Sequence, residues 1–219
     1  MPRLLFEKTG RAVWISHLDL MRLFQRAFKR AGLPLTHTQG FNPRPSVSIA
    51  LPLSVGTQSH CELLDFDLDG QAVSCDEIMT KLNSALVEGV RVRKVYENGS
   101  KMKHLSYLDC LVTFVYDRPV ADSDTQKIAA LFTQPSLTVE KKGKNGATEQ
   151  DIIPMIRNMT VSRETDRRIA VLARICCQNP TLNPAQLTAA VQKYLPELSP
   201  DSAQYTRLEI YDQEENIFR

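Results

Sequence analysis

The sequence lacks the residue patterns that indicate a metal centre or a redox site. Its five cysteines are irregularly spaced and contain no Cys-x-x-Cys, so zinc-ribbon, thiol-redox and iron–sulfur ligand sets are missing. We expect them to be free thiols, mostly buried. The four histidines have no metal-ligand spacing either, so no metal and no other cofactor is predicted. These residues are Cys61, Cys75, Cys110, Cys176, Cys177, His17, His37, His60 and His104.

Membrane, export and common catalytic signatures are also missing. No window approaches the ~18 uninterrupted apolar residues of a membrane span. The N-terminus has an acid and a base where a signal peptide has an apolar run, so a cytoplasmic protein without membrane association is expected. There is no Walker loop, Gly-x-Ser-x-Gly, His-Glu-x-x-His or aromatic RNP motif.

The pattern of hydrophobic residues and turn signals predicts an ordered alternation of strands and helices in 219 residues. In the first half we expect strands at Arg3–Lys8, Ala12–Ile15, Ser46–Leu53, Glu62–Leu68 and Val90–Tyr96, with helices at His17–Ala31 and Asp76–Leu86. In the second half we expect strands at Leu105–Tyr116, Ser136–Lys141, Arg168–Cys176 and Tyr205–Tyr211, helices at Asp124–Phe132 and Pro184–Tyr194, a mobile polar loop at Lys142–Gln150, and frayed final residues.

Each half thus follows the strand–helix–strand–strand–helix–strand order of the split βαβ, or ferredoxin-like, arrangement, with an added hairpin in the first half. The predicted fold class is α+β, with two tandem ferredoxin-like halves whose antiparallel sheets are covered by helices. The polar segment Glu97–Lys103 separates them, which places the domains at residues 1–98 and 104–219.

Positive charge is concentrated near the start of the chain. Between Arg11 and Pro45 there are six Lys/Arg and one acid, although the whole chain carries only +2. Arg22, Arg26 and Arg30 recur at i, i+4 and i+8, on one face of the first predicted helix, with Lys29 beside them. Guanidinium groups in this arrangement suit phosphate or carboxylate. The alternative is a solvated face, or ion pairs with the seven acids of residues 60–89.

A stiff loop follows this helix, with the sequence Gln39-Gly-Phe-Asn-Pro-Arg-Pro45. Its two prolines restrict the backbone, which lowers the ordering cost of binding through Gln39, Phe41, Asn42 and Arg44. The alternative is a tight connection in which Phe41 plugs the core. His17, at the start of the helix, is a candidate general acid or base for RNA cleavage, or it simply hydrogen-bonds a backbone group.

Several segments together resemble the radical-SAM-linked domain family. They are Ser16-His-Leu-Asp-Leu-Met-Arg22, Arg26-Ala, Lys29-Arg-Ala-Gly-Leu-Pro34, Gln39-Gly-Phe-Asn-Pro-Arg-Pro45, Pro52-Leu-Ser-Val-Gly56 and, less distinctively, Asp151-Ile-Ile-Pro154. The resemblance covers essentially the whole chain and implies a domain of unknown function, found C-terminal to radical SAM proteins or alone. This chain is similar to the stand-alone form, because it has no cysteine motif for a radical SAM cluster.

Three functions are compatible with these residues. The first is a non-catalytic RNA-binding or substrate-presenting module that works with an RNA-processing enzyme or a radical SAM protein. Its anion-binding residues would be Arg22, Arg26, Lys29, Arg30, Gln39, Phe41, Asn42 and Arg44. The second is a metal-independent RNA-cleaving enzyme that uses His17. The third is a protein-interaction module that docks on an acidic partner.

Overall fold

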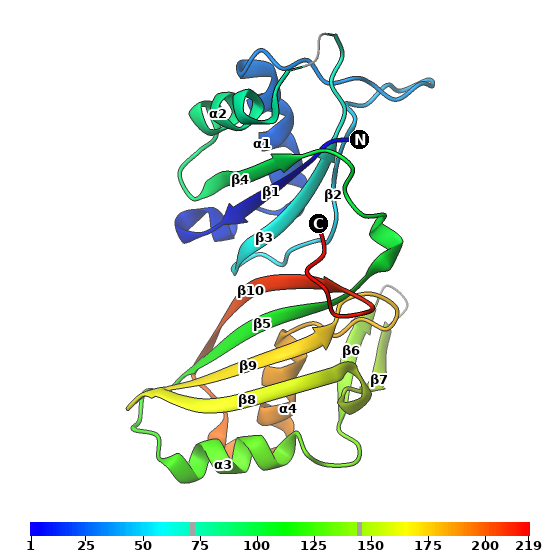
Figure 1. Cartoon of the computed structure of the whole chain (residues 1–219). Coiled ribbons are helices and arrows are strands. Elements are labelled where there is room, and N and C mark those ends of the chain that lie inside the picture. The colour runs from blue at the N-terminus through cyan, green and yellow to red at the C-terminus, as the bar shows by residue number, and fades with distance from the viewer. Residues whose placement is uncertain (71–72, 144–145) are drawn as a thin grey trace. The chain divides into compact units, whose positions relative to one another are not determined.

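The computed structural model describes residues 1–70, 73–143 and 146–219 and has a mixed α+β fold (Figure 1). The chain divides into two compact units. The N-terminal unit comprises residues 1–104 together with Arg219, and the C-terminal unit comprises residues 105–218. The described part of the chain contains no helix that is long and apolar enough to cross a membrane.

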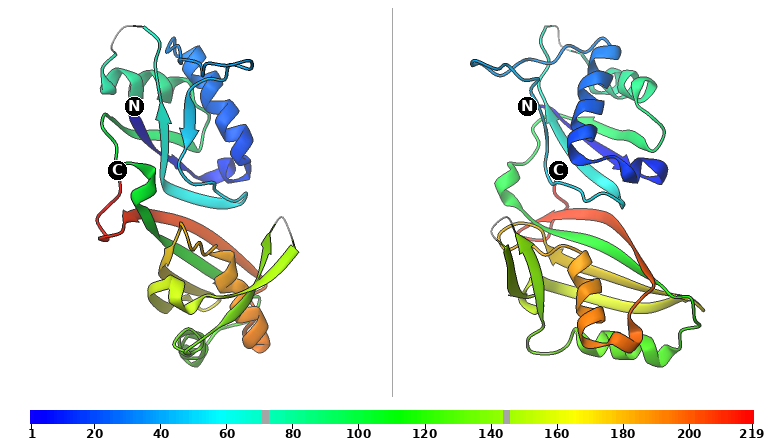
Figure 2. Two further views of the ribbon diagram at one scale, coloured as in Figure 1. Left: turned by 90° about the vertical axis from the view of Figure 1, so that its right-hand side faces the viewer. Right: turned by 180° about the vertical axis from the view of Figure 1, so that it is seen from behind.

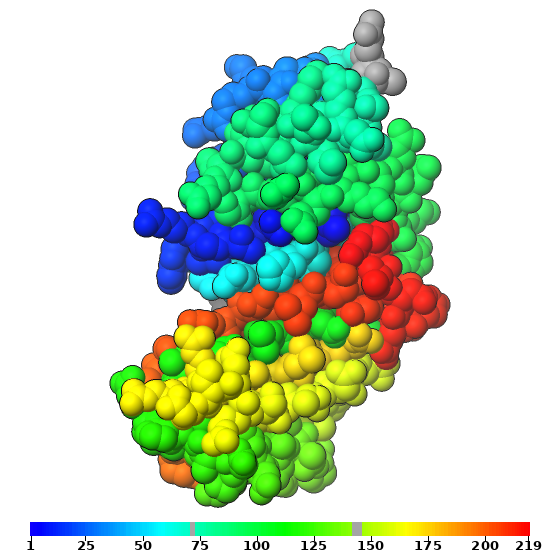
Figure 3. All heavy atoms as spheres, turned by 60° about the vertical axis from the view of Figure 1, so that its left-hand side comes forward, coloured from blue at the N-terminus to red at the C-terminus, as the bar shows by residue number. Residues whose placement is uncertain are grey.

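The N-terminal unit is an antiparallel sheet with two helices packed on one face (Figure 2). The strand order is β4-β1-β3-β2. Figure 3 shows α2 at the surface of this unit, in blue-green. The elements are β1 (Arg3–Lys8), the 3-10 helix η1 (Gly10–Trp14), α1 (His17–Arg30), β2 (Val47–Ile49), β3 (Thr57–Phe66), α2 (Cys75–Ala85), β4 (Val90–Tyr96) and the 3-10 helix η2 (Met102–His104).

Helix α1 lies where the sequence predicts it, because its ends carry strong signals. The Ser16 hydroxyl accepts the Asp19 N–H at 3.2 Å and caps the first turn. At the other end Gly32 has φ 68°, and the N–H of Leu33 reaches back to the carbonyl of Phe28 at 3.0 Å. This is the Schellman closure that a left-handed residue after a helix permits. The buried stripe of α1 consists of Leu20, Phe24, Ala27 and Phe28.

Two expectations for the N-terminal unit are wrong in part. Residues Ala12–Ile15 form no second strand: the chain turns at Gly10 into η1, and the Lys8 ammonium donates to the carbonyl of Ile15 at 2.8 Å. A short apolar run does not distinguish a strand from a helical turn. The strand expected at Ser46–Leu53 is limited to β2.

In the C-terminal unit four strands pair in antiparallel fashion in the order β10-β5-β9-β8. Alternate buried residues on its central strands, such as Val112, Phe114, Val171 and Ala173, form the core side. A separate two-stranded ribbon, β6-β7, is inserted between α3 and β8. The elements are β5 (Leu105–Val115), α3 (Asp122–Leu131), β6 (Thr138–Gly143), β7 (Gly146–Asp151), η3 (Ile153–Met155), β8 (Ile156–Thr165), β9 (Arg168–Cys176), α4 (Ala185–Tyr194), η4 (Pro196–Leu198) and β10 (Ser202–Asp212).

In the second half, the structure differs from the predicted elements mainly between Ser136 and Thr165. The strand expected at Ser136–Lys141 exists as β6, but the neighbour of β9 is β8, which the sequence analysis missed. Residues 144 and 145 of the expected mobile loop lie outside the described residues, while 146–150 belong to β7. The final residues are held rather than frayed, because the Phe218 N–H donates to the carbonyl of Ile210 at 2.9 Å.

All five cysteines are free thiols. Cys61, Cys110 and Cys177 are buried, and the other two are half-buried. Burial raises the pKa of the Cys110 and Cys177 thiols to about 12, because the thiolate loses its hydration inside the core.

Candidate anion-binding site

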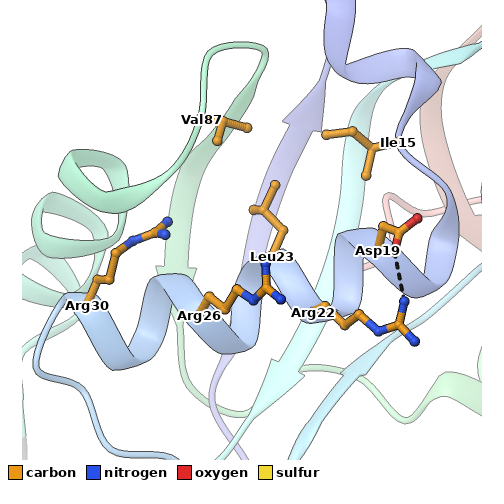
Figure 4. A pocket seen from close by; sticks show the side chains of 7 residues that line it. All are labelled: Ile15, Asp19, Arg22, Leu23, Arg26, Arg30 and Val87. Carbon is orange, nitrogen blue, oxygen red and sulfur yellow. Dashed lines mark hydrogen bonds and ion pairs between the residues drawn. The ribbon is translucent and has the colours of Figure 1, made fainter.

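The three arginines predicted to share a face of α1 line a common groove. Arg22, Arg26 and Arg30 lie along one side of the helix, around a groove of about 450 Å³ (Figure 4). Its lining also includes Ile15, Asp19, Leu23 and Val87. The sequence spacing of four residues is what places these three side chains together.

These arginines differ in how far they are already engaged. Arg22 pairs with Asp19 of its own helix at 2.9 Å, with both side chains at least 60% exposed. Arg30 donates to the carbonyl of Ala85 at 2.6 Å, which attaches it to the end of α2. Arg26 makes no hydrogen bond or ion pair with the residues that the structure describes. The hydroxyl of Ser16 and then Arg22 hold the pKa of Asp19 below its usual value.

The acidic stretch at residues 60–89 does not neutralise this face. All of its acids are described, and none of them pairs with an α1 arginine. Instead Asp65 forms an ion pair with Arg3 at 2.6 Å and Glu77 pairs with Lys81 at 2.7 Å. The alternative of internal ion pairing is therefore wrong for the described residues, and the cations of α1 face outward.

The stiff loop predicted after α1 lies in a projecting hairpin, residues 36–46, which we call the arm (Figure 2). The Thr38 N–H donates to the Arg44 carbonyl at 2.8 Å, and the Arg44 N–H donates to the Thr38 hydroxyl at 3.0 Å. At its base the backbone and hydroxyl of Thr36 both donate to Asp67 at 3.0 Å. The arm is thus braced both across itself and to the body of the unit.

The tip of the arm is exposed to solvent. Phe41 is completely exposed, so the alternative that it plugs the core is wrong. Gly40 has φ 139°, a conformation that favours glycine and turns the tip. Gln39, Asn42 and Arg44 are exposed as well. An exposed aromatic side chain on a braced loop is available for contact with a partner.

Two further grooves run between α1 and the arm, and we call them together the trough. The larger, about 730 Å³, is lined by residues that include His17, Arg22 and Arg44. The smaller, about 420 Å³, is lined by residues that include Phe28 and Lys29. The grooves share Gln25 and Pro45, so they adjoin one another. None of their lining residues is acidic.

The structure thus divides the predicted site residues into three groups. His17, Arg22, Lys29 and Arg44 meet in the trough; Arg26 and Arg30 face the neighbouring groove; Gln39, Phe41 and Asn42 lie on the arm and line neither part of the trough. Sequence reasoning missed Gln25. The signal that could have found it is its spacing, three residues after Arg22 and four before Lys29, which places it on the same helical face.

The fold and this site define a mixed α+β protein with a cationic, acid-free trough on its N-terminal unit. The chain belongs to the bacterial family described as "Uncharacterized protein conserved in bacteria (DUF2344)", whose model matches residues 2–184. No curated protein sequence matches it.

Several solved structures are similar to the chain, and two of them illustrate the range of likeness. One is a chain of a Cbf5-Nop10-Gar1 complex, with a TM-score of 0.50 and 6% identity over 95% of this chain and 48% of that chain. The present chain therefore spans about half the length of that neighbour, and the likeness concerns the fold alone. The other is an unknown protein from Galdieria sulphuraria, with a TM-score of 0.27 and 11% identity over 94% of this chain and 96% of that one, too weak a likeness to carry an argument.

Proposed function

We propose that the N-terminal unit binds RNA through the trough, as a non-catalytic RNA-binding or substrate-presenting module. The observation that carries this proposal is the trough lining, which brings Arg22, Lys29 and Arg44 together and contains no acid. Phosphate contacts from such cations supply most of the sequence-independent affinity of nucleic-acid binding.

The state of these cations favours an external anion. Lys29 and Arg44 have side chains that make no hydrogen bond or ion pair with described residues. The ion pair of Arg22 with Asp19 is exposed, and such pairs contribute only about 0–1 kcal/mol, so a phosphate competes with it at small cost. Because the arm is braced before binding, little conformational entropy is lost when Arg44 engages a ligand.

The strand orders and the family motifs support two finer proposals. Each unit has the element order of the split βαβ with strands arranged 4-1-3-2, and on that ground we assign both units to the ferredoxin-like arrangement. The resemblance to the radical-SAM-linked family suggests the partner: an RNA-processing enzyme or a radical SAM protein to which this module presents its RNA.

The test is RNA binding by two charge-reversed variants of equal charge. In Arg22→Glu/Arg44→Glu the trough is reversed; in Arg91→Glu/Lys94→Glu two exposed cations of β4 that line neither part of the trough are reversed. A fluorescein-labelled single-stranded RNA is titrated at low salt and followed by anisotropy. Binding is expected for the wild type and the β4 variant and not for the trough variant.

Two results would overturn the proposal. One is no RNA binding by the wild type at low salt; the other is equal binding by both variants while circular dichroism shows both folded. If a pull-down with the wild-type protein from cells instead recovers one stoichiometric protein and no nucleic acid, the protein-interaction function replaces the RNA-binding proposal.

A second candidate function is favoured by the position of His17. This residue is the first of α1 and lines the same groove as Arg22 and Arg44, so an imidazole and two guanidinium groups surround one space. Such an arrangement suits metal-independent RNA cleavage, with the arginines stabilising the charge of the transition state. Cleavage in EDTA that disappears in His17→Ala would establish it, and cleavage that persists in that variant would remove His17 from the mechanism.

A further inference from the structure

The smaller groove of the trough differs chemically from the larger one. Its floor is apolar: Phe28, Leu33 and Leu35 line it and are themselves almost completely buried. Exposed Pro34 and His37 form part of its rim. A volume of about 420 Å³ lies within the range of roughly 300–1,000 Å³ that is typical of small-molecule sites.

Gln25 lies where the two grooves meet. It lines both of them, and its side-chain amide makes no hydrogen bond with the residues that the structure describes. An amide offers two donors and one carbonyl acceptor to a ligand. At this junction it faces an apolar pocket on one side and the guanidinium-lined groove of Arg22 and Arg44 on the other.

The apolar pocket, the Gln25 amide and the guanidinium-lined groove match the ring, the polar edge and the phosphates of a nucleotide. We propose that the smaller groove is a subsite for one unstacked nucleobase, while the phosphates on either side of that nucleotide are held by Arg22, Lys29 and Arg44. The base would stack on the exposed rings of His37 and Pro34 above the apolar floor, and the Gln25 amide would hydrogen-bond its edge. Proteins read single-stranded RNA by this combination of stacking and edge hydrogen bonds.

The inference rests on the proposed RNA binding, which it refines from phosphate contact to base recognition. It also explains why the pocket adjoins the cationic groove. A phosphate-binding surface alone needs no apolar pocket, whereas a nucleotide that leaves its stack has a ring whose transfer from water to such a pocket is favourable.

The decisive comparison changes the ligand and needs no protein variant. The wild-type protein is titrated with a labelled single-stranded RNA and with a reduced abasic ribose–phosphate chain of the same length and charge. We expect the RNA to bind about tenfold more tightly, because stacking one base changes affinity by roughly that factor or more. Equal affinities would overturn the subsite and leave the proposed phosphate binding standing; failure of both ligands to bind would overturn both.

Variants at the junction supply the second arm of the test. Gln25→Trp fills the pocket, so the ratio of RNA affinity to abasic affinity should fall toward one. Gln25→Leu keeps the pocket open but removes the amide, so affinity differences among homopolymeric RNAs should shrink. Gln126→Leu, an exposed glutamine change on α3, is the matched control and should change nothing. If folded Gln25→Trp keeps the wild-type ratio of RNA affinity to abasic affinity, the subsite is refuted.

Discussion

The salt dependence of RNA binding gives the sharpest test of the trough, because its magnitude follows from the cations that line it. Three arginine or lysine side chains line the trough: Arg22, Lys29 and Arg44. Each phosphate contact on a single strand contributes about −0.7 to the slope of log K against log salt. Three contacts therefore predict a slope of about −2, which corresponds to a loss of roughly 18-fold in affinity between about 50 and 200 mM salt.

The perturbation is Arg22→Ala/Arg44→Ala, which leaves one trough cation. The slope should fall to about −0.7 and the loss over the same salt range to roughly threefold. Anisotropy titrations of one labelled RNA at several salt concentrations measure both quantities. Arg91→Ala/Lys94→Ala removes the same charge from β4 and should keep the wild-type slope. If the trough variant also keeps that slope, the phosphates are bound elsewhere and the assignment of the trough is refuted; Arg26→Ala then examines the neighbouring groove.

Four further outcomes are expected. Phe41→Ala should change the free energy of unfolding by less than about 0.5 kcal/mol, because the ring is fully exposed, and an unaltered RNA affinity would exclude it as a stacking platform. Phe24→Ala should cost about 3–5 kcal/mol in urea unfolding, since this ring is buried in the core and packs edge-on against Phe6 at 4.7 Å; a loss under 1 kcal/mol would contradict that packing. Gly89→Ala should lower the free energy of unfolding by about 2–4 kcal/mol, because φ is 84° and an added Cβ atom would meet the Thr9 carbonyl oxygen. An alanine variant as stable as the wild type would show that this turn relaxes freely. Folding raises the pKa of the Cys110 and Cys177 thiols from the ordinary 9.0 to about 12, so as pH rises the unfolded chain loses these protons before the folded one. The free energy of unfolding should therefore decline between pH 9 and 12. The decline should be smaller in Cys110→Ser/Cys177→Ser, once the packing cost of the substitutions at neutral pH is subtracted.

Much of the fold could be predicted from local signals. Helix α1 ends within one residue of its predicted position, because the Ser16 cap and Gly32 are encoded in the sequence next to the helix. Strands β4 and β9 have the predicted bounds, because one is an alternating run and the other a nearly continuous apolar one. Strand β8 was missed because its sequence is mostly polar, although it forms a hairpin with β9, the next strand along the chain.

The candidate site was only partly predictable, because part of it depends on contacts between segments that are far apart in the sequence. The arginine face of α1 follows from helical periodicity, and the stiffness of the arm follows from its prolines and glycine. The meeting of Arg44 with His17 and Arg22 depends on how the arm folds back beside α1, which is fixed by the attachment of Thr36 to Asp67, far away in sequence. No local pattern encodes that contact, and the apolar pocket beside Gln25 depends on it too.

The single tryptophan of the chain gives the N-terminal unit its own optical reporter. Trp14 lies in η1, is 72% exposed, and its ring covers Gly56, where a Cβ atom would lie 3.5 Å from a ring carbon. Intrinsic emission excited at the indole band consequently reports on the N-terminal unit, while the far-ultraviolet ellipticity averages over both. Melting curves recorded by the two signals on the unlabelled protein will coincide if the units unfold as one cooperative block, and will separate if each has its own transition.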